Sequence, residues 1–293
     1  MSSAYESIIE HVSRWYDDHA RELPWRGADV SPWAVMVSEF MLQQTPVARV
    51  IPAFEAWLER WPQPADLAAD STGEAVRMWG KLGYPRRALR LHAAATEITR
   101  AHNGVVPSDL AALKALPGVG DYTAAALCAF AFGKRVAVVD TNVRRVVHRA
   151  VLGAADAGPS TTKADFALVD EMLPEDDAAA AHASIALMEL GALVCTAKDP
   201  RCADCPIVGE CAWVAAGKPE YDGPPKRAQR FAGTDRQVRG LLMDVLRAAD
   251  EPVAKHALDI VWSDDEQRER ALTGLLDDRL AVTTSDGRYS LPT

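Results

Sequence analysis

Four of the five cysteines of the 293-residue chain lie within seventeen residues, and this segment constrains the fold more than any other feature of the sequence. They follow the spacing C-x6-C-x2-C-x5-C, at Cys195, Cys202, Cys205 and Cys211. Four thiols in one short loop are typical of a metal site, either an iron–sulfur cluster or structural zinc. Zinc sites usually contain two C-x2-C-like pairs, whereas only Cys202 and Cys205 have that spacing. The pattern therefore favours an iron–sulfur centre and leaves zinc as the alternative.

The composition is that of a soluble globular protein, with 48% apolar and 25% charged residues. The sequence contains no run of about 18 apolar residues, so no transmembrane helix is predicted. The N-terminal segment is charged throughout and lacks the apolar core of a signal peptide. We therefore expect a cytoplasmic protein without a disulfide framework. The fifth cysteine, Cys128, lies in an apolar segment and is expected to be a packed core thiol.

Most of the first 220 residues are predicted to be helical, because apolar residues recur at helical spacing and Pro and Gly separate the segments. One such helix is expected from Pro32 to about Thr45. Residues 218–230 contain three prolines and one glycine and predict a linker. Beyond it we expect helices at about 235–249, 253–261 and 264–276, followed by a hairpin at Asp286-Gly287. This order indicates a small winged-helix-like domain at residues 231–293.

The charge is unevenly distributed along the chain. The net charge is −9, which by itself argues against a nucleic-acid partner. Residues 77–149, however, contain twelve Lys and Arg against four acids, a net charge of +8, so the remainder carries −17. A basic segment in an acidic protein indicates one local surface for phosphate.

The turn LPGVG, residues 116–120, joins two predicted helices within this basic segment. A tight turn with two glycines leaves the backbone N–H groups of Gly118, Val119 and Gly120 unshielded at a helix N-terminus, which is a natural phosphate site. A plain helix–helix turn would have the same sequence. The surrounding positive charge favours a helix–hairpin–helix element that binds DNA.

Two carboxylates occupy apolar settings. Glu39 is the only charge between Asp29 and Arg49, and a desolvated glutamate there would suit proton transfer. The alternative is a glutamate on a solvated helix stripe. Asp140 ends the apolar run VAVV, where an aspartate also suits the N-cap of the next helix. Capping and a catalytic role are compatible if the carboxylate also faces a cleft.

Together these motifs resemble the helix–hairpin–helix DNA glycosylase superfamily, and within it the MutY-type adenine DNA glycosylases. The resemblance covers roughly residues 5–221. It is carried by the cysteine cluster and by LPWR (23–26), SEFMLQQTPV (38–47), KLGY (81–84), LPGVGDYTA (116–124), VDTNVRRV (139–146) and MELGALVC (188–195). Their order and spacing along the chain make the resemblance specific.

The resemblance implies a mainly α, two-lobed fold with an iron–sulfur cluster loop. The cluster lobe would comprise residues 1–28 and 137–217, and a six-helix lobe with the hairpin would comprise residues 29–136. The linker 218–230 and the winged-helix-like domain 231–293 would follow. The family's cluster is [4Fe–4S], which implies that cofactor here rather than zinc.

The resemblance also implies the chemistry. Glu39 would protonate the adenine ring, and Asp140 would stabilise the oxocarbenium ion of the sugar, with Asn142 supporting Asp140. Tyr122 stands where lyase relatives resembling endonuclease III carry lysine. Without that amine no Schiff base forms readily, which implies a monofunctional glycosylase.

The target base must leave the duplex to be reached. Gln44 and Tyr84 match positions that insert into the helix, and Trp25 and Arg26 would line the base pocket. A helix-surface amide, a turn tyrosine and a core tryptophan are the structural alternatives for Gln44, Tyr84 and Trp25.

The expected substrate is duplex DNA with adenine opposite 8-oxoguanine or guanine, and the protein is expected to act as a monomer. A mismatch thymine glycosylase, an endonuclease III-like lyase and a non-catalytic lesion-binding protein are the alternatives. Two departures from the family stand out: Thr141 replaces the usual glycine after Asp140, and residues 231–293 are too few for the Nudix-like domain of the best-known relatives.

Overall fold

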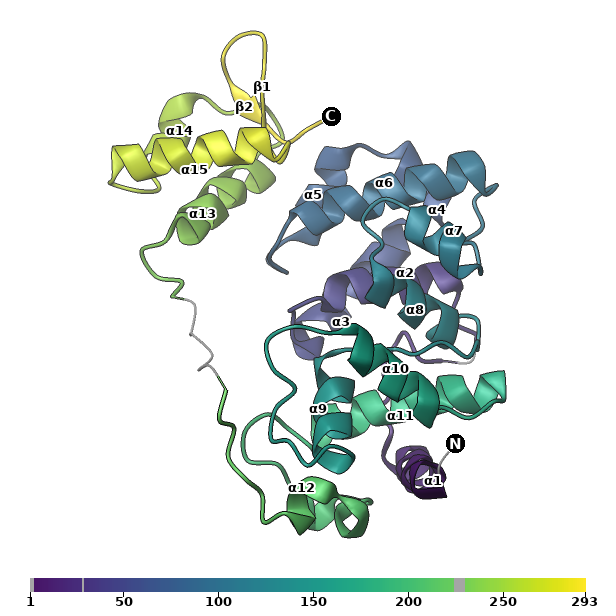
Figure 1. Ribbon diagram of the computed structural model, residues 1–293. Helices are drawn as coiled ribbons and strands as arrows, with labels where there is room; N and C mark the ends of the chain where they lie inside the picture. The colour runs from purple at the N-terminus through teal and green to yellow at the C-terminus, as the bar shows by residue number, and fades with distance from the viewer. Residues whose placement is uncertain (1–2, 28, 224–229) are drawn as a thin grey trace. The chain divides into compact units, whose positions relative to one another are not determined.

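The computed structural model describes residues 3–27, 29–223 and 230–293. These residues are mainly helical and include one two-stranded sheet (Figure 1). Contacts divide the chain into two compact units. The first unit comprises residues 1–35, 108–114 and 119–226, and the second comprises residues 36–107, 115–118 and 227–293.

The contacts assign residues 119–136 to the first unit, whereas the sequence assigned them to the six-helix lobe. The boundaries given above for the cluster lobe and the six-helix lobe therefore stay a prediction. Of the predicted linker 218–230, residues 224–229 lie outside the described residues.

In the first unit, α1 and α9 pack against the long helix α11, which supplies the centre of the hydrophobic core (Figure 1). Val12 of α1, Val143 of α9 and Leu187 of α11 are fully buried. The helices of this unit are α1 (Ser3–His19), α8 (Asp121–Phe130), α9 (Thr141–Ala150), α10 (Lys163–Met172), α11 (Asp177–Leu193) and α12 (Ala212–Ala215), with α7 (Leu110–Ala115) at its boundary. Two short 3-10 helices, η1 (Cys202–Asp204) and η2 (Val208–Glu210), lie in the cysteine segment.

Side-chain caps fix the starts of three of these helices. Asp140, Thr162 and Asp176 each accept a hydrogen bond from a backbone N–H of the first turn of α9, α10 and α11, respectively. Such caps satisfy N–H groups that have no partner within the helix. The beginning of α9 at Thr141 is therefore dictated by the residue before it.

In the second unit, α6 (Arg86–Ala101) packs against α4 (Pro64–Ala69) and α5 (Thr72–Trp79). Trp57 of α3 (Val47–Arg60) lies edge-on to Trp61 and Trp79, with ring centroids 4.6 and 5.7 Å apart. All three tryptophans are essentially fully buried. Aromatic edge-to-face contacts of this kind add to the free energy gained by burial.

Helix α2 (Pro32–Leu42) ends three residues before the predicted end at Thr45. The chain turns at Gln44, whose φ of 57° lies in the left-handed region and cannot continue a right-handed helix. The sequence carried no local sign of this turn, because neither glycine nor asparagine stands there.

The C-terminal residues contain α13 (Asp235–Ala248), α14 (Lys255–Asp259) and α15 (Asp265–Asp277), close to the expected helices. An antiparallel hairpin follows, with Val282 of β1 (Val282–Thr283) opposite Ser290 of β2 (Tyr289–Ser290). Val253, between α13 and α14, forms an isolated bridge with Tyr289. The order of elements is the one expected, and the winged-helix-like assignment stays a prediction.

Candidate active site

Asp140 is half-buried and held by three hydrogen bonds. Oδ1 accepts from the backbone N–H groups of Asn142 (2.8 Å) and Val143 (2.7 Å), and Oδ2 accepts from Nδ2 of Asn142 (2.7 Å). Burial raises the pKa of Asp140, whereas these hydrogen bonds and the charge of Arg145 act to lower it. The capping role is confirmed, and the same contacts fix the direction of the carboxylate.

Asn142 connects Asp140 to a wider network. Its Oδ1 accepts from Arg145 (2.8 Å), which also donates to the carbonyl groups of Gly191 and Cys195 (both 2.6 Å). A Cβ on Gly191 would lie 2.7 Å from the Cβ of Asn142, so only glycine allows α11 to approach α9 so closely. The structure thus brings together two of the predicted site residues, Asp140 and Asn142.

Glu39 lies on α2 and is 5% exposed, next to Ser38 and Phe40, which are also buried. A solvated helix stripe is therefore excluded for this residue. Glu39 belongs to the second unit and Asp140 to the first.

Trp25 and Arg26 lie in the segment after α1, and Trp25 is 8% exposed. Nη2 of Arg26 donates to Oε2 of Glu189 on α11 (3.0 Å), and Arg21 donates to both carboxylate oxygens of Glu189. Nη1 of Arg26 is buried and makes no hydrogen bond within the described residues.

Glu189 was missed by the sequence reasoning. Burial acts to raise its pKa, but the hydrogen bonds and charges of Arg21 and Arg26 lower it to about 2. It is the only charged residue between Asp177 and Lys198, and the criterion that singled out Glu39 would have found it. Glu189 holds Arg26 in position and stays ionised.

Gln44 and Tyr84 are both exposed and both have positive φ, 57° and 47°. Left-handed backbone is strained for residues other than glycine, asparagine and aspartate. Tyr84 leaves 46% of its surface exposed, which is high for a large aromatic residue. Two strained loops therefore present these side chains to solvent.

The LPGVG turn requires glycine at one of its two positions. Gly118 has a φ of 78°, and a Cβ there would lie 2.6 Å from the Cβ of Arg90. Gly120 is the N-cap of α8 and has open space around it, which leaves room for a phosphate. The side chain of Val119 is buried, so only its backbone can contact a ligand. Tyr122, in the first turn of α8, packs beside the buried core residues of this helix.

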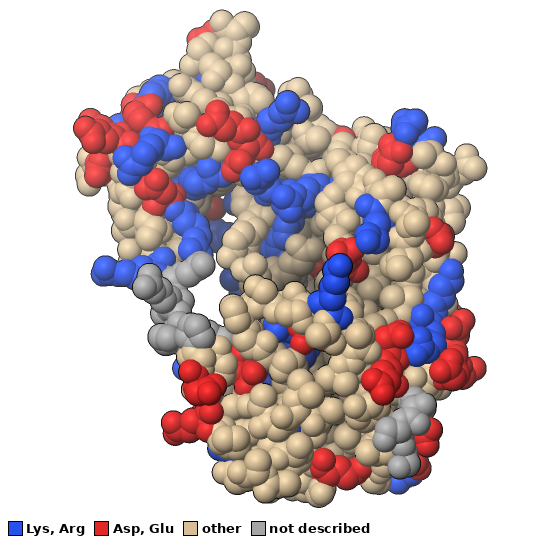
Figure 2. Space-filling view, viewed as in Figure 1, with Lys and Arg blue, Asp and Glu red and all other residues tan. Residues whose placement is uncertain are grey.

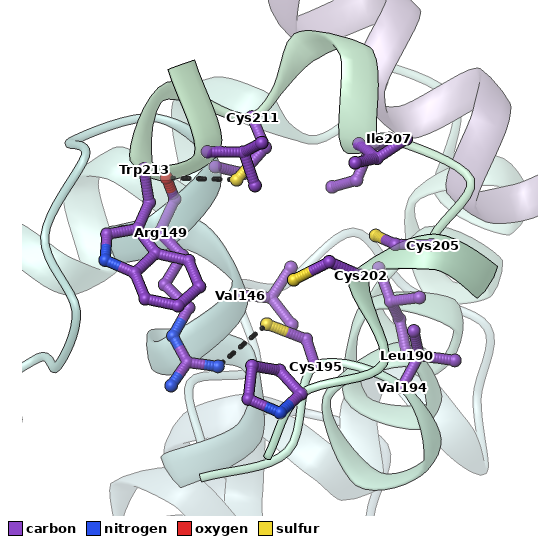
Figure 3. A pocket seen from close by; sticks show the side chains of 14 residues that line it. Val146, Arg149, Leu190, Val194, Cys195, Cys202, Cys205, Ile207, Cys211 and Trp213 are labelled. Carbon is purple, nitrogen blue, oxygen red and sulfur yellow. Dashed lines mark hydrogen bonds between the residues drawn. The ribbon is translucent and has the colours of Figure 1, made fainter. Parts of the chain in front are cut away.

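The four clustered cysteines line one cavity, and their sulfur atoms point into it (Figure 3). The remaining walls are largely apolar and include Val146, Leu190, Val194, Ile207 and Trp213. Within the part of the chain that the structure describes, no three Cys, His, Asp or Glu side chains converge as one metal ion requires. Cys128 lies elsewhere, 1% exposed in α8, which confirms it as a core thiol.

Arg149 of α9 lines this cavity and contacts two of the four cysteines (Figure 3). Its Nη1 donates to Sγ of Cys195 (3.4 Å), its carbonyl oxygen accepts from Sγ of Cys211 (3.5 Å), and its guanidinium stacks on Trp213. Burial raises the pKa of Cys195, and it raises the pKa of Cys205 to about 11. Thiols in this setting need a positive centre to become thiolates.

The sequence of the chain is similar to those of known DNA repair proteins. Residues 37–171 match the HhH-GPD superfamily of base excision DNA repair proteins. The adenine DNA glycosylase of Mycobacterium tuberculosis is 57% identical over 279 residues, which are 95% of this chain and 91% of that protein. The adenine DNA glycosylase of Mycolicibacterium smegmatis is 55% identical over 286 residues, 97% of this chain and 96% of that protein.

The chain belongs to the adenine DNA glycosylases. A solved thermostable thymine-DNA glycosylase has the same fold over 73% of this chain and 97% of its own, with a TM-score of 0.66 and 25% identity. Because the similarity to adenine DNA glycosylases is much higher and extends over nearly the full length, the adenine branch of the superfamily is confirmed over the thymine branch.

Membership of the adenine DNA glycosylases makes the protein a DNA glycosylase and confirms the predicted helix–hairpin–helix fold. None of its described helices is long and apolar enough to cross a membrane.

Proposed function

We propose that this adenine DNA glycosylase removes adenine paired with 8-oxoguanine or guanine in duplex DNA and leaves an abasic site. The observation that carries this proposal is the setting of its two carboxyl groups. Glu39 is 5% exposed on α2, and Asp140 is held in a fixed direction by three hydrogen bonds. Paired carboxyl groups in different environments are what acid-assisted cleavage of a glycosidic bond needs.

In this reaction, Glu39 donates its proton to a ring nitrogen of the flipped adenine. The bond between N9 and C1′ then breaks, and its electron pair stays with the base. The carboxylate of Asp140 stabilises the positive charge that develops on the sugar, while Asn142 and the N–H groups of α9 hold that carboxylate in place. Water supplies the hydroxyl group at C1′ and gives its other proton to the carboxylate of Glu39, which restores the acid.

The absence of an amine at position 122 supports hydrolysis without strand cleavage. Tyr122 stands in the first turn of α8, where a lysine would be the nucleophile of a lyase. Trp25 and Arg26 form the pocket for the extruded base, and the buried Nη1 of Arg26 donates to an acceptor on it.

The DNA backbone is bound at the LPGVG turn, where the N–H groups of Gly118, Val119 and Gly120 meet a phosphate at the start of α8. Gln44 and Tyr84 enter the duplex from their exposed loops. The enzyme acts as a monomer in the bacterial cytoplasm, on the nucleoid.

Cys195, Cys202, Cys205 and Cys211 hold a [4Fe–4S] cluster. The donor set fits, because four thiols point into one largely apolar cavity beside the cation of Arg149. One zinc ion would need all four sulfur atoms within about 4 Å of one another, whereas a cluster offers each thiolate its own iron atom. The cluster would bind the segment from α11 to α12 together, and Arg149 would offset its negative charge.

A panel of duplexes tests the proposed substrate. Adenine opposite 8-oxoguanine, adenine opposite guanine, thymine opposite guanine and thymine glycol are each incubated with the protein and then treated with alkali. Strand scission is expected only for the two adenine duplexes and only after alkali. Scission of the thymine duplexes, or scission before alkali, would contradict the proposal.

Asp140→Asn tests the assignment of the carboxylate. Asparagine can still cap α9 but carries no charge, so base release should fall by about a thousandfold or more. The dissociation constant for an adenine duplex should stay within about threefold of the original value. Base release at an undiminished rate would remove Asp140 from the mechanism.

A further inference from the structure

Arg87 lies in the first turn of α6 and is 4% exposed, although it carries a formal charge. Its two terminal nitrogens make six hydrogen bonds. Nη1 donates to the carbonyl oxygens of Phe40 (2.8 Å), Met41 (3.1 Å) and Gln43 (2.6 Å), and Nη2 donates to Oγ1 of Thr45 (3.0 Å) and to the carbonyl oxygens of Leu82 (3.3 Å) and Gly83 (3.0 Å).

Two of these acceptors, the carbonyl groups of Phe40 and Met41, lie at the end of α2, and the other four belong to two loops that are separate in the sequence. The first loop, residues 43–45, follows α2 and contains Gln44, and the second, residues 82–84, precedes α6 and contains Tyr84. Oγ1 of Thr45 donates to the carbonyl oxygen of Leu82 (3.0 Å), so the loops also contact each other directly. A single guanidinium therefore ties together the two loops that carry the exposed Gln44 and Tyr84.

The six acceptors are all uncharged oxygens, which makes this burial costly. Burial lowers the pKa of Arg87 to about 10, so the side chain remains charged at neutral pH. A buried cation without a carboxylate partner is tolerated only where several dipoles converge on it. Here it faces the last carbonyl groups of α2, the negative end of that helix.

The backbone of the two loops depends on this support. Gln44 and Tyr84 each adopt positive φ, which costs about 1 kcal/mol or more for such residues unless the surroundings compensate. The guanidinium of Arg87 also lies over the ring of Trp79 (5.1 Å) and near the ring of Tyr84 (5.6 Å). Arg87 thus contacts both loops and also the ring of Tyr84.

We propose that Arg87 is a positioning residue that fixes Gln44 and Tyr84 relative to each other, so that they enter the duplex together. The inference rests on the proposed roles of Gln44 and Tyr84 in extruding the base. A planar guanidinium can serve two loops at once through its two terminal nitrogens, whereas the single ammonium of lysine cannot. The proposed role therefore depends on the two terminal nitrogens of the guanidinium and not on its positive charge alone.

The test uses Arg87→Lys in the full-length protein carrying Asp140→Asn, which prevents turnover. The duplex carries 2-aminopurine next to the target adenine, because this base fluoresces when it is unstacked. We expect the fluorescence gain on binding to be largely lost, while affinity for an undamaged duplex changes by less than about threefold. In the protein with Asp140 intact, single-turnover base release should slow by about ten- to a hundredfold, since small displacements have effects of that size.

Arg144→Lys is the matched control. Arg144 is also 4% exposed and also donates to loop carbonyl groups, of Ala157 (2.5 Å) and Ser160 (2.6 Å), in the other unit, and it differs from Arg87 in pairing with the buried Asp165 (3.1 Å). It should shift the thermal midpoint as Arg87→Lys does and leave the 2-aminopurine signal unchanged. If Arg87→Lys does not fold, Thr45→Val replaces it, because this change removes one acceptor and the direct loop–loop hydrogen bond.

Double-variant cycles decide how Arg87 acts. If it acts through Gln44 and Tyr84, combining Arg87→Lys with Gln44→Ala or Tyr84→Ala should slow base release by less than the product of the single effects. Multiplicative effects, or an unchanged fluorescence signal in a folded Arg87→Lys protein, would overturn the inference. An unchanged signal in Gln44→Ala and Tyr84→Ala would instead overturn the proposed roles of that pair.

Discussion

At the scale of single residues, the proposed mechanism gives Asp140 a second task beside capping, and the two tasks place different demands on its carboxylate. As the cap of α9 it needs only an oxygen acceptor, whereas as a stabiliser of positive charge it must be ionised. Burial raises its pKa, which works against ionisation, and the hydrogen bonds from Asn142 and Val143 limit that effect. The hydrogen bonds that begin α9 therefore also favour the ionised form of the Asp140 carboxylate.

This balance predicts a pH dependence. Because the pKa of Asp140 is raised, its carboxylate takes up a proton at a higher pH than an ordinary aspartate, and base release should fall accordingly on the acid side. Asn142→Ala removes a hydrogen bond that lowers this pKa, so the acid limb of the single-turnover rate should move to higher pH.

Asn103→Gly is the control, since Asn103 is exposed, lies far along the chain from Asp140 and has a φ of 53° that glycine accepts. Its pH profile should match that of the original protein. An acid limb that stays in place in Asn142→Ala would show that Asp140 does not set it.

At the scale of elements, Glu189 attaches the segment after α1 to α11. Its carboxylate is fully buried and receives hydrogen bonds from Arg21 and Arg26. Because its pKa is lowered to about 2, the carboxylate stabilises the fold at neutral pH, and this contribution is lost as the pH falls from about 4 towards 2.

Glu189→Gln leaves two buried or half-buried arginines without their carboxylate, and it should lower the free energy of unfolding at pH 7 by about 3 kcal/mol. Urea unfolding at pH 7 and at pH 3 should show the difference from the original protein shrinking at the lower pH. Glu97→Gln, at an exposed pair with Arg100, should have little effect at either pH. Equal losses for both variants would contradict this account.

The cysteine segment predicts a second result at this scale. Cys202→Ser should abolish bound iron and acid-labile sulfide and lower the thermal midpoint by about 5 °C or more. Cys128→Ser, in the core of α8, should keep the iron and the brown colour. A colourless Cys128→Ser protein, or a zinc-containing original protein, would contradict the cluster.

An element could be predicted from the sequence where the residues that begin or end it lie next to it in the chain. The start of α9 and the turn at Gly118 follow from caps and glycines that are visible in the sequence. The end of α2 does not, because Arg87, far along the chain, takes up its last carbonyl groups. The isolated charge of Glu189 was visible in the sequence, but its pairing with Arg21 and Arg26 was not, since these partners are distant along the chain.

At the scale of the whole molecule, the net charge of −9 conceals how the basic residues are used. Part of the +8 segment is not freely available to phosphate. Arg87 and Arg144 are buried, and Arg135 and Lys114 pair with Asp170 and Asp121. On the face shown in Figure 2, acidic side chains predominate over the region that carries α9 to α12. The proposed binding of phosphate would therefore use the exposed cations that remain, together with backbone N–H groups.

Arg90 is one such cation. It is exposed on α6, and its side chain packs against Gly118 of the LPGVG turn. Arg100 on the same helix is also exposed but is hydrogen-bonded to Glu97 (2.6 Å). If Arg90 neutralises one phosphate beside the turn, Arg90→Ala should reduce the slope of log K against log salt by about 1.

The measurement is equilibrium binding of undamaged and adenine–8-oxoguanine duplexes over a range of salt concentrations. Arg90→Ala should weaken binding to both duplexes by a similar factor, because a phosphate contact carries no information about the base. Arg100→Ala should leave the slope and both affinities unchanged. A loss confined to the mismatched duplex would assign Arg90 to base recognition, and equal slopes in the two variants would show that the turn binds phosphate through its N–H groups alone.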